Sequence, residues 1–323
     1  MTRRRQVALA AALVAAALLA FFAYVIVAPD ALIRMEFARQ RHDATLSRET
    51  REVAGHRWVY AYREAKTPDA PTIVMVHGFV GGKENFYPLA RALAGKYRLV
   101  IPDLPGWGES QRVPNENYGF LAQSERLAAF IRNVSPGEPV VLVGHSMGGG
   151  IAALVAAGHP ELVSRVALID AAGVRFDDNV FGADVIAGRN PYAVNDRASL
   201  DRFLATVFHV EDAKPWLPWP ADKAYIARRT RDAAFEQQVL GAIGRGPERF
   251  LPGNEAARIQ QPTLLLWCRQ DTVIDPSALA LYAARIPQAK GVLLDDCGHM
   301  SIMERPEDVA IAIDQLIERG LPR

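Results

Sequence analysis

The sequence has little cysteine, no excess of either charge and no internal repeat. Its 323 residues include only two cysteines, Cys268 and Cys297, which lie outside any CxxC pair, so a disulfide-dense scaffold and a structural zinc site are both excluded. The sequence leaves open whether these two cysteines pair with each other. The 37 basic and 36 acidic residues nearly balance, which argues against a nucleic-acid-binding groove. The composition also excludes a disordered or collagen-like chain.

Long apolar runs are missing except for one. Residues 7–28 are 22 consecutive hydrophobic residues, which as a helix would reach about 33 Å, enough to cross a hydrocarbon core of about 30 Å. A single run excludes a multi-span membrane protein. Only three basic residues precede it, so the rest of the chain carries 34 basic and 36 acidic residues, a balance typical of an ordinary soluble domain.

This N-terminal segment, residues 1–28, is predicted to be a retained transmembrane anchor. Arg3, Arg4 and Arg5 precede the apolar run, so the positive-inside tendency would keep them in the cytoplasm and place the rest of the chain on the exported side. The alternative is a cleaved signal peptide and a secreted protein. The run is longer than the roughly 7 to 15 residues of a signal-peptide core, which favours the anchor.

The following segment, residues 29–52, carries five arginines and five acidic residues. We expect either a juxtamembrane helix that lies near the lipid surface or a charged, solvated linker.

After residue 52, short apolar runs alternate with helix-patterned stretches, which is typical of a mostly parallel sheet covered by helices. The predicted buried strands span residues 72–76, 98–102, 140–143, 166–170, 263–267 and 291–295, and residues 57–62 suit an antiparallel edge strand. The predicted helices span residues 83–94, 121–133, 147–158, 276–285 and 306–319.

One interval, about residues 171–253, contains no convincing strand. Its prolines and aromatic residues lie among helix formers, and a segment of this length inside a domain should carry structure of its own. We therefore predict a helical cap over the active edge of the sheet. Most of its aromatic residues are expected to form the core of that cap.

The strongest local motif is Gly144-His145-Ser146-Met147-Gly148, which follows an apolar run and precedes a helix-forming stretch. This is G-x-S-x-G in the strand, turn and helix context that it requires. The glycines permit a very tight turn, and the turn pushes the serine Oγ out above the sheet. We therefore predict that Ser146 is a nucleophile.

A serine hydroxyl needs a base to remove its proton, and the partners of this motif follow along the chain in the order Ser, acid, His. Of the seven histidines, only His299 comes after both the serine and the last predicted strands. Asp271 lies four residues beyond a predicted strand and is the favoured acid, which would orient the imidazole. Asp275 and Asp170 remain alternatives.

An oxyanion hole requires two backbone amides. One is expected from Met147, and the other from Phe79 in the loop His77-Gly78-Phe79, with His77 in a structural role. Asp103 is expected to shape the opposite loop and not to act in catalysis. The P-loop and HExxH motifs are absent, and no cofactor or metal is predicted.

Several of these motifs occur together in one known family. The matching residues are His77-Gly78-Phe79, residues 103–110, 144–149 and 267–275, and Cys297-Gly298-His299 followed by Met303-Glu304-Arg305-Pro306. From about residue 55 onward the chain resembles α/β-hydrolases, in particular membrane-anchored monoacylglycerol lipases and the bacterial lipases of the Moraxella and Psychrobacter type. Cys268 departs from the pattern, which usually has glycine there.

The resemblance implies an α/β-hydrolase fold over residues 53–323, with the cap inserted after the sixth strand. It also implies hydrolysis of carboxylic esters of lipids through an acyl-enzyme, without a cofactor. A general carboxylesterase or a carbon–carbon bond hydrolase on the same triad is the alternative, and a non-catalytic ligand-binding relative is a further one.

Overall fold

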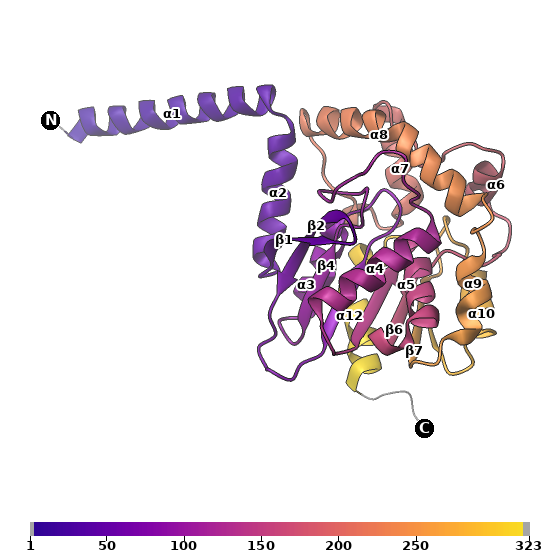
Figure 1. Cartoon of the computed structure of the whole chain (residues 1–323). Coiled ribbons are helices and arrows are strands. Elements are labelled where there is room, and N and C mark those ends of the chain that lie inside the picture. The colour runs from indigo at the N-terminus through magenta and orange to yellow at the C-terminus, as the bar shows by residue number, and fades with distance from the viewer. Residues whose placement is uncertain (1–2, 319–323) are drawn as a thin grey trace.

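The computed structural model describes residues 3–318 and is built around an eight-stranded sheet with helices on both faces (Figure 1). The strands are β1 (Ser47–Val53), β2 (His56–Arg63), β3 (Thr72–Val76), β4 (Arg98–Pro102), β5 (Val140–His145), β6 (Val163–Ile169), β7 (Thr263–Cys268) and β8 (Lys290–Leu294). Their spatial order is β1-β2-β4-β3-β5-β6-β7-β8, and every neighbouring pair from β4 to β8 is parallel. The predicted mostly parallel sheet flanked by helices is confirmed.

Helices precede β1, connect the strands from β3 to β8, and follow β8. They are α1 (Arg3–Val27), α2 (Asp30–Asp43), α3 (Tyr87–Ala92), α4 (Phe120–Val134), α5 (Met147–Gly158), α6 (Val180–Ile186), α7 (Arg197–Val207), α8 (Ala221–Gly244), α9 (Leu251–Glu255), α10 (Ser277–Ala283), α11 (Ser301–Glu304) and α12 (Pro306–Glu318). The predicted helix end at Arg319 lies outside the described residues, as do residues 1 and 2 of the predicted N-terminal segment.

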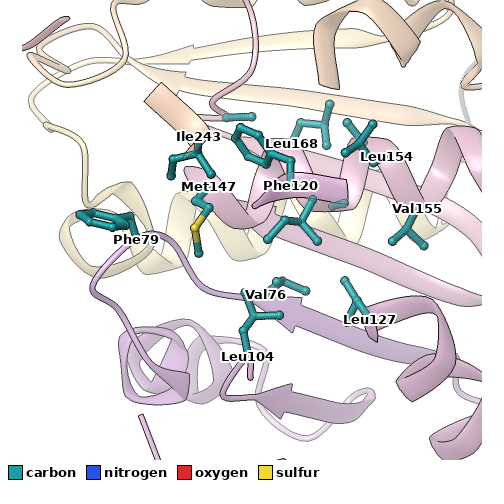
Figure 2. Close-up of a cluster of buried hydrophobic side chains, with 14 of the residues drawn as sticks. Val76, Phe79, Leu104, Phe120, Leu127, Met147, Leu154, Val155, Leu168 and Ile243 are labelled. Atoms are coloured by element: carbon teal, nitrogen blue, oxygen red, sulfur yellow. The ribbon is translucent and has the colours of Figure 1, made fainter. Parts of the chain in front are cut away.

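Successive side chains of a strand point to opposite faces, and the central strands bury both. Val74 and Val76 of β3 belong to the apolar cluster that also contains residues of α4, α5 and the cap, part of which Figure 2 shows. Ile73 and Met75 belong to a second cluster, with residues of α3 and α12. Because both faces are covered, the central strands read as continuous apolar runs in the sequence.

The structure adds a strand within the segment that we expected to be a helix or linker. β1 pairs antiparallel with β2, and the two-residue turn at Ala54 and Gly55 has positive φ at both positions, 52° and 76°. The sequence Ser-Arg-Glu-Thr-Arg-Glu-Val has no apolar alternation because this strand is largely exposed. The strand is therefore held mainly by backbone pairing, which the hydrophobic pattern does not report.

β2 is antiparallel, as predicted, but it is not the edge strand. It lies between β1 and β4 and pairs with both. Trp58 and Val59 are fully buried, consistent with this inner position.

The cap forms from the chain between β6 and β7 and contains helices α6, α7 and α8 and no strand among its described residues. Its aromatic side chains divide into two groups. Phe181, Phe203 and Phe208 are buried, as expected for a small core, whereas Trp216 and Trp219 are exposed. The expectation that most of the aromatic residues form the core of the cap agrees with the first group, and the two exposed tryptophans are exceptions to it.

Helix α1 projects away from the sheet, and α2 leads back to it at a sharp angle (Figure 1). α1 has 25 residues and is long and apolar enough to cross a membrane. Most of its large apolar side chains, among them Leu13, Leu19 and Phe22, are exposed, and Val25 near its end is buried, so the protein covers little of this helix.

Candidate active site

Ser146 occupies the turn between β5 and α5, at the carboxyl edge of the sheet. Its φ is 55° and its ψ is −121°, a conformation that L-residues rarely adopt. A Cβ on Gly144 would lie 2.2 Å from the carbonyl oxygen of Gly148, and one on Gly148 would lie 2.2 Å from the carbonyl oxygen of Val76. Both glycines are therefore required by close backbone contacts, and these contacts hold the serine in its strained position.

The structure brings the three predicted residues Ser146, His299 and Asp271 into one hydrogen-bonded line. The Ser146 hydroxyl donates to Nε2 of His299 over 2.9 Å, and Nδ1–H of His299 donates to Oδ2 of Asp271 over 2.8 Å. All three residues are buried. The distances suit proton transfer from the hydroxyl to the imidazole.

The carboxylate of Asp271 is fixed from its other side. Its Oδ1 accepts hydrogen bonds from the amides of Val273 and Ile274, at 2.8 and 3.0 Å. The alternative acids have other partners: Asp275 accepts from the Ser277 amide, and Asp170 accepts from the Cys268 amide and the Ser301 hydroxyl. Of the three carboxylates considered from the sequence, only Asp271 contacts the histidine.

Burial controls the protonation of this line of residues. It lowers the pKa of His299 to about 3, so the imidazole is neutral at neutral pH and can accept a proton. Burial also raises the pKa of the Asp271 carboxyl, and the amides of Val273 and Ile274 oppose that rise.

The two residues whose amides are expected to form an oxyanion hole, Phe79 and Met147, line the same cavity as Ser146. Among residues 3–318, neither the Phe79 nor the Met147 amide donates a hydrogen bond to another group of the chain. Gly78 lets the Phe79 loop come close, because a Cβ there would lie 2.9 Å from Ser146 Cβ. His77 has the structural role that we predicted: Nδ1–H donates to the Gly78 carbonyl, and Nε2 accepts from the Leu104 amide.

A cavity with an empty volume of about 610 Å³, part of it open solvent, extends from Ser146 under the cap. Phe79 and Met147 line its base, and helix α8 contributes Ile243 to its wall. Of the described residues that line the cavity, only Arg249 carries a charge. An apolar cavity with a few polar groups at one end is typical of a small-molecule or lipid site.

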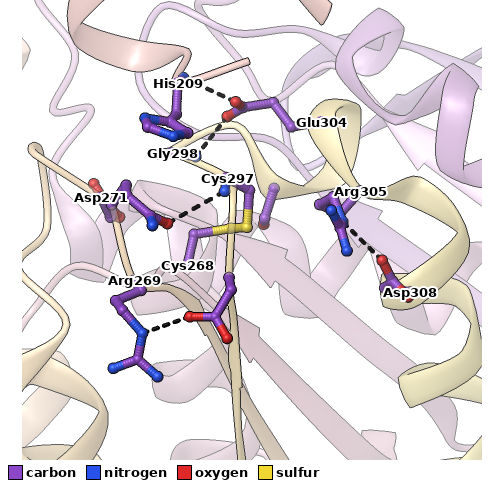
Figure 3. The surroundings of a disulfide bond; sticks show 12 residues. His209, Cys268, Arg269, Asp271, Cys297, Gly298, Glu304, Arg305 and Asp308 are labelled. Carbon is purple, nitrogen blue, oxygen red and sulfur yellow. Dashed lines mark hydrogen bonds and ion pairs between the residues drawn. A yellow bond between two sulfur atoms is a disulfide. The ribbon is translucent and has the colours of Figure 1, made fainter.

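A disulfide joins the two loops that carry the acid and the base (Figure 3). Cys268 ends β7, three residues before Asp271, and Cys297 precedes His299 by two residues. The Cα atoms of the cysteines are 5.3 Å apart, within the usual range for a disulfide. The pairing that the sequence left open therefore ties the two loops covalently.

Glu304 adds a second link, which was not predicted from the sequence (Figure 3). Its Oε1 accepts from the Gly298 amide over 2.9 Å, next to His299, and its Oε2 accepts from the amides of His209 and Val210 in the cap, over 2.8 and 2.7 Å. One carboxylate thus connects the histidine loop to the cap. In the sequence, Glu304 is marked only by the family motif Met303-Glu304-Arg305-Pro306, and this motif does not indicate what the residue contacts.

Known proteins share this architecture. A family model described as alpha/beta hydrolase fold matches residues 71–306. Lipase 1 of Psychrobacter immobilis is 28% identical over 285 residues, covering 85% of each chain, and human monoacylglycerol lipase ABHD6 is 27% identical over 303 residues, covering 91% of this chain and 88% of the relative. The crystal structure of a bacterial membrane phospholipase A superposes with a TM-score of 0.83 at 31% identity, covering 98% of this chain and 99% of the other.

Replacing both cysteines by serine, Cys268→Ser with Cys297→Ser, should lower the free energy of unfolding by about 3.5 kcal/mol, because the bond closes a loop of 29 residues in the unfolded chain. Urea unfolding measures the change. A reductant should destabilise the wild type similarly and leave the double variant unaffected. Equal stability of both proteins under oxidising conditions would contradict the prediction.

Glu304→Ala should weaken the link between the histidine loop and the cap, because the amides of Gly298, His209 and Val210 lose their acceptor. Hydrogen exchange at these three amides should become faster by at least about tenfold, since a hydrogen bond to a charged group is worth about 1.5 to 3 kcal/mol. Glu307→Ala, an exposed neighbour, is the control and should leave their exchange unchanged. Unaltered protection in Glu304→Ala would show that other contacts hold the loop.

Proposed function

Because the chain belongs to the α/β-hydrolase fold family and is a carboxylic ester hydrolase, we propose that it cleaves esters of lipids, such as monoacylglycerols, through an acyl-enzyme formed on Ser146. The observation that carries the proposal is the hydrogen-bonded line of Ser146, His299 and Asp271 at the base of an apolar cavity. The relatives named as lipases support the substrate class.

In the first half-reaction, Oγ of Ser146 attacks the ester carbonyl while Nε2 of His299 takes the hydroxyl proton. The amides of Phe79 and Met147 donate to the oxyanion of the tetrahedral intermediate. His299 then gives the proton to the leaving alcohol, and the acyl group stays on Ser146. Asp271 stabilises the imidazolium that forms in between.

In the second half-reaction, His299 takes a proton from water, and the resulting hydroxide attacks the acyl-enzyme carbonyl. Collapse of the second tetrahedral intermediate breaks the bond to Oγ, and the proton returns from His299 to Ser146. The products are one alcohol and one carboxylic acid, with the enzyme restored.

We also propose that α1 is retained as a membrane anchor and that the catalytic domain lies on the exported side. Three arginines precede the apolar run, which favours a cytoplasmic N-terminus. The Cys268–Cys297 disulfide supports an oxidising compartment for the body of the protein. A lipid substrate in the same bilayer would then lie within reach of the enzyme.

Release of p-nitrophenol from esters of increasing acyl length tests the reaction. Wild-type protein should prefer octanoate or longer chains to acetate, because the cavity is mostly apolar. Ser146→Ala should lower kcat by at least about a thousandfold, since it removes the nucleophile. Undiminished hydrolysis by Ser146→Ala would exclude the proposed mechanism, and a preference for acetate would favour a general esterase.

The pH profile tests the role of His299. Only the neutral imidazole can accept the serine proton, and burial lowers the pKa of His299 from 6.5 to about 3. The activity should therefore persist below pH 6.5 and decline only as the pH falls toward the lowered pKa. Stability should begin to decline earlier, as the pH falls from 6.5 to about 3, because over this range the unfolded chain binds a proton that the folded site excludes.

We would measure kcat/KM as a function of pH for a soluble ester, with circular dichroism at each pH to show that the fold persists. An acid limb with a midpoint at or above 6.5, in protein that remains folded, would contradict the lowered pKa.

A further inference from the structure

Two tryptophans of the cap are exposed on the loop between α7 and α8. The Trp loop, defined here as residues 214–220, has the sequence Lys-Pro-Trp-Leu-Pro-Trp-Pro. The side chain of Trp216 is 86% exposed and that of Trp219 is 53% exposed, whereas the other three tryptophans are buried. Exposing two of the largest apolar side chains to water is unfavourable, so a ligand or a surface that covers them would stabilise the loop.

The Trp loop lies beside the apolar helix α1. The rings of Trp219 and Phe22 are tilted against each other with their centroids 6.5 Å apart. Figure 1 shows the start of α8, which follows the loop, near the corner where α1 meets α2, and α2 also contacts α8. The position of the Trp loop relative to α1 is therefore fixed by its contact with Phe22 and by the packing of α2 against α8.

The position of Phe22 gives the depth of the loop relative to a bilayer. Phe22 precedes the end of the apolar run at Ala28 by six residues, which is about 9 Å along a helix. If α1 spans the membrane, Phe22 lies in the leaflet on the exported side, and the Trp219 ring, 6.5 Å from it, lies within reach of the interface on that side. Tryptophan is enriched at this level, where its ring contacts acyl chains and its N–H can reach polar groups.

We propose that the Trp loop is a membrane-docking element, which inserts Trp216 and Trp219 into the interfacial layer of the bilayer that holds α1. The inference rests on the proposed anchoring by α1 and adds a second attachment point to it. Pro215, Pro218 and Pro220 restrict the backbone of the loop, so that docking costs little conformational entropy.

Docking at this point would orient the cap over the membrane. α8 begins directly after the loop, and its last turns contribute Leu240 and Ile243 to the wall of the cavity. One continuous helix thus runs from the membrane contact to the candidate substrate site. A lipid surface is favoured as the occupant because the ring of Trp219 packs beside Phe22 and so continues the exposed apolar surface of α1.

Quenching of tryptophan fluorescence by brominated lipids tests the proposal on the full chain in phospholipid vesicles. Because Trp58, Trp107 and Trp267 are buried, the quenchable emission should come from the Trp loop. Emission of the wild type should fall in brominated vesicles, and more strongly when the bromines are near the headgroup than near the chain ends. The variant W216F/W219F should lose this quenching.

Absence of quenching in wild-type protein whose α1 resists alkaline extraction would overturn the proposal, as would association of two chains through the loop in place of lipid contact. N-terminal sequencing shows whether α1 is retained. A mature chain that begins after Ala28 would overturn docking beside α1 together with the anchor.

An activity measurement separates this proposal from the proposed function. W216A/W219A should hydrolyse an ester embedded in vesicles more slowly than the wild type, and it should hydrolyse a soluble p-nitrophenyl ester at the same rate. I311A removes an apolar side chain of similar exposure, 55%, from α12 and should change neither rate. Failure of the wild type on both esters would refute the proposed function, whereas equal vesicle rates for wild type and W216A/W219A would refute docking alone.

Discussion

The close backbone contact between the turn at Ser146 and the neighbouring strand β3 is the constraint on which the site depends. Gly148 packs against the carbonyl of Val76, and no side chain fits between them. This contact places Ser146 above the sheet edge and starts α5 in the same turn. The Ser146 carbonyl accepts a hydrogen bond from the Ala172 amide, so the beginning of the cap is attached to the same point. The nucleophile, the helix and the beginning of the cap are thus positioned together at this one turn.

Asp271 and His299 belong to the C-terminal part of the chain, and other interactions fix their positions. Asp271 is held by two backbone amides, and the loops of Asp271 and His299 are joined by the Cys268–Cys297 disulfide. Hydrogen bonds with Glu304 then join the histidine loop to the cap. Steric contacts fix the serine turn, and hydrogen bonds and the disulfide fix the loops of Asp271 and His299. Together these constraints hold the Ser–His–Asp line at hydrogen-bonding distance.

The sequence predicts much of this arrangement because its signals are local. The run Thr72–Val76 identifies a strand that is buried on both faces, and the strand, glycine and helix around Ser146 identify the turn. β1 escaped prediction because it is stabilised by pairing with β2 and carries exposed polar side chains. The cysteine pairing, the three hydrogen bonds of Glu304 and the exposure of Trp216 depend on contacts between distant segments, which residue patterns do not encode.

The cap leaves the sheet after β6 and returns at β7, and these two strands are adjacent, with Val166 paired to Thr263. The cap is therefore an insertion between two adjacent strands, and its length and shape can change without moving either of them. Such a segment is suited to exchange between related enzymes, and each exchange would reshape the cavity over an unchanged floor. An exchanged segment would have to meet one requirement. It must place two backbone amides where they can donate to the carboxylate of Glu304, as those of His209 and Val210 do.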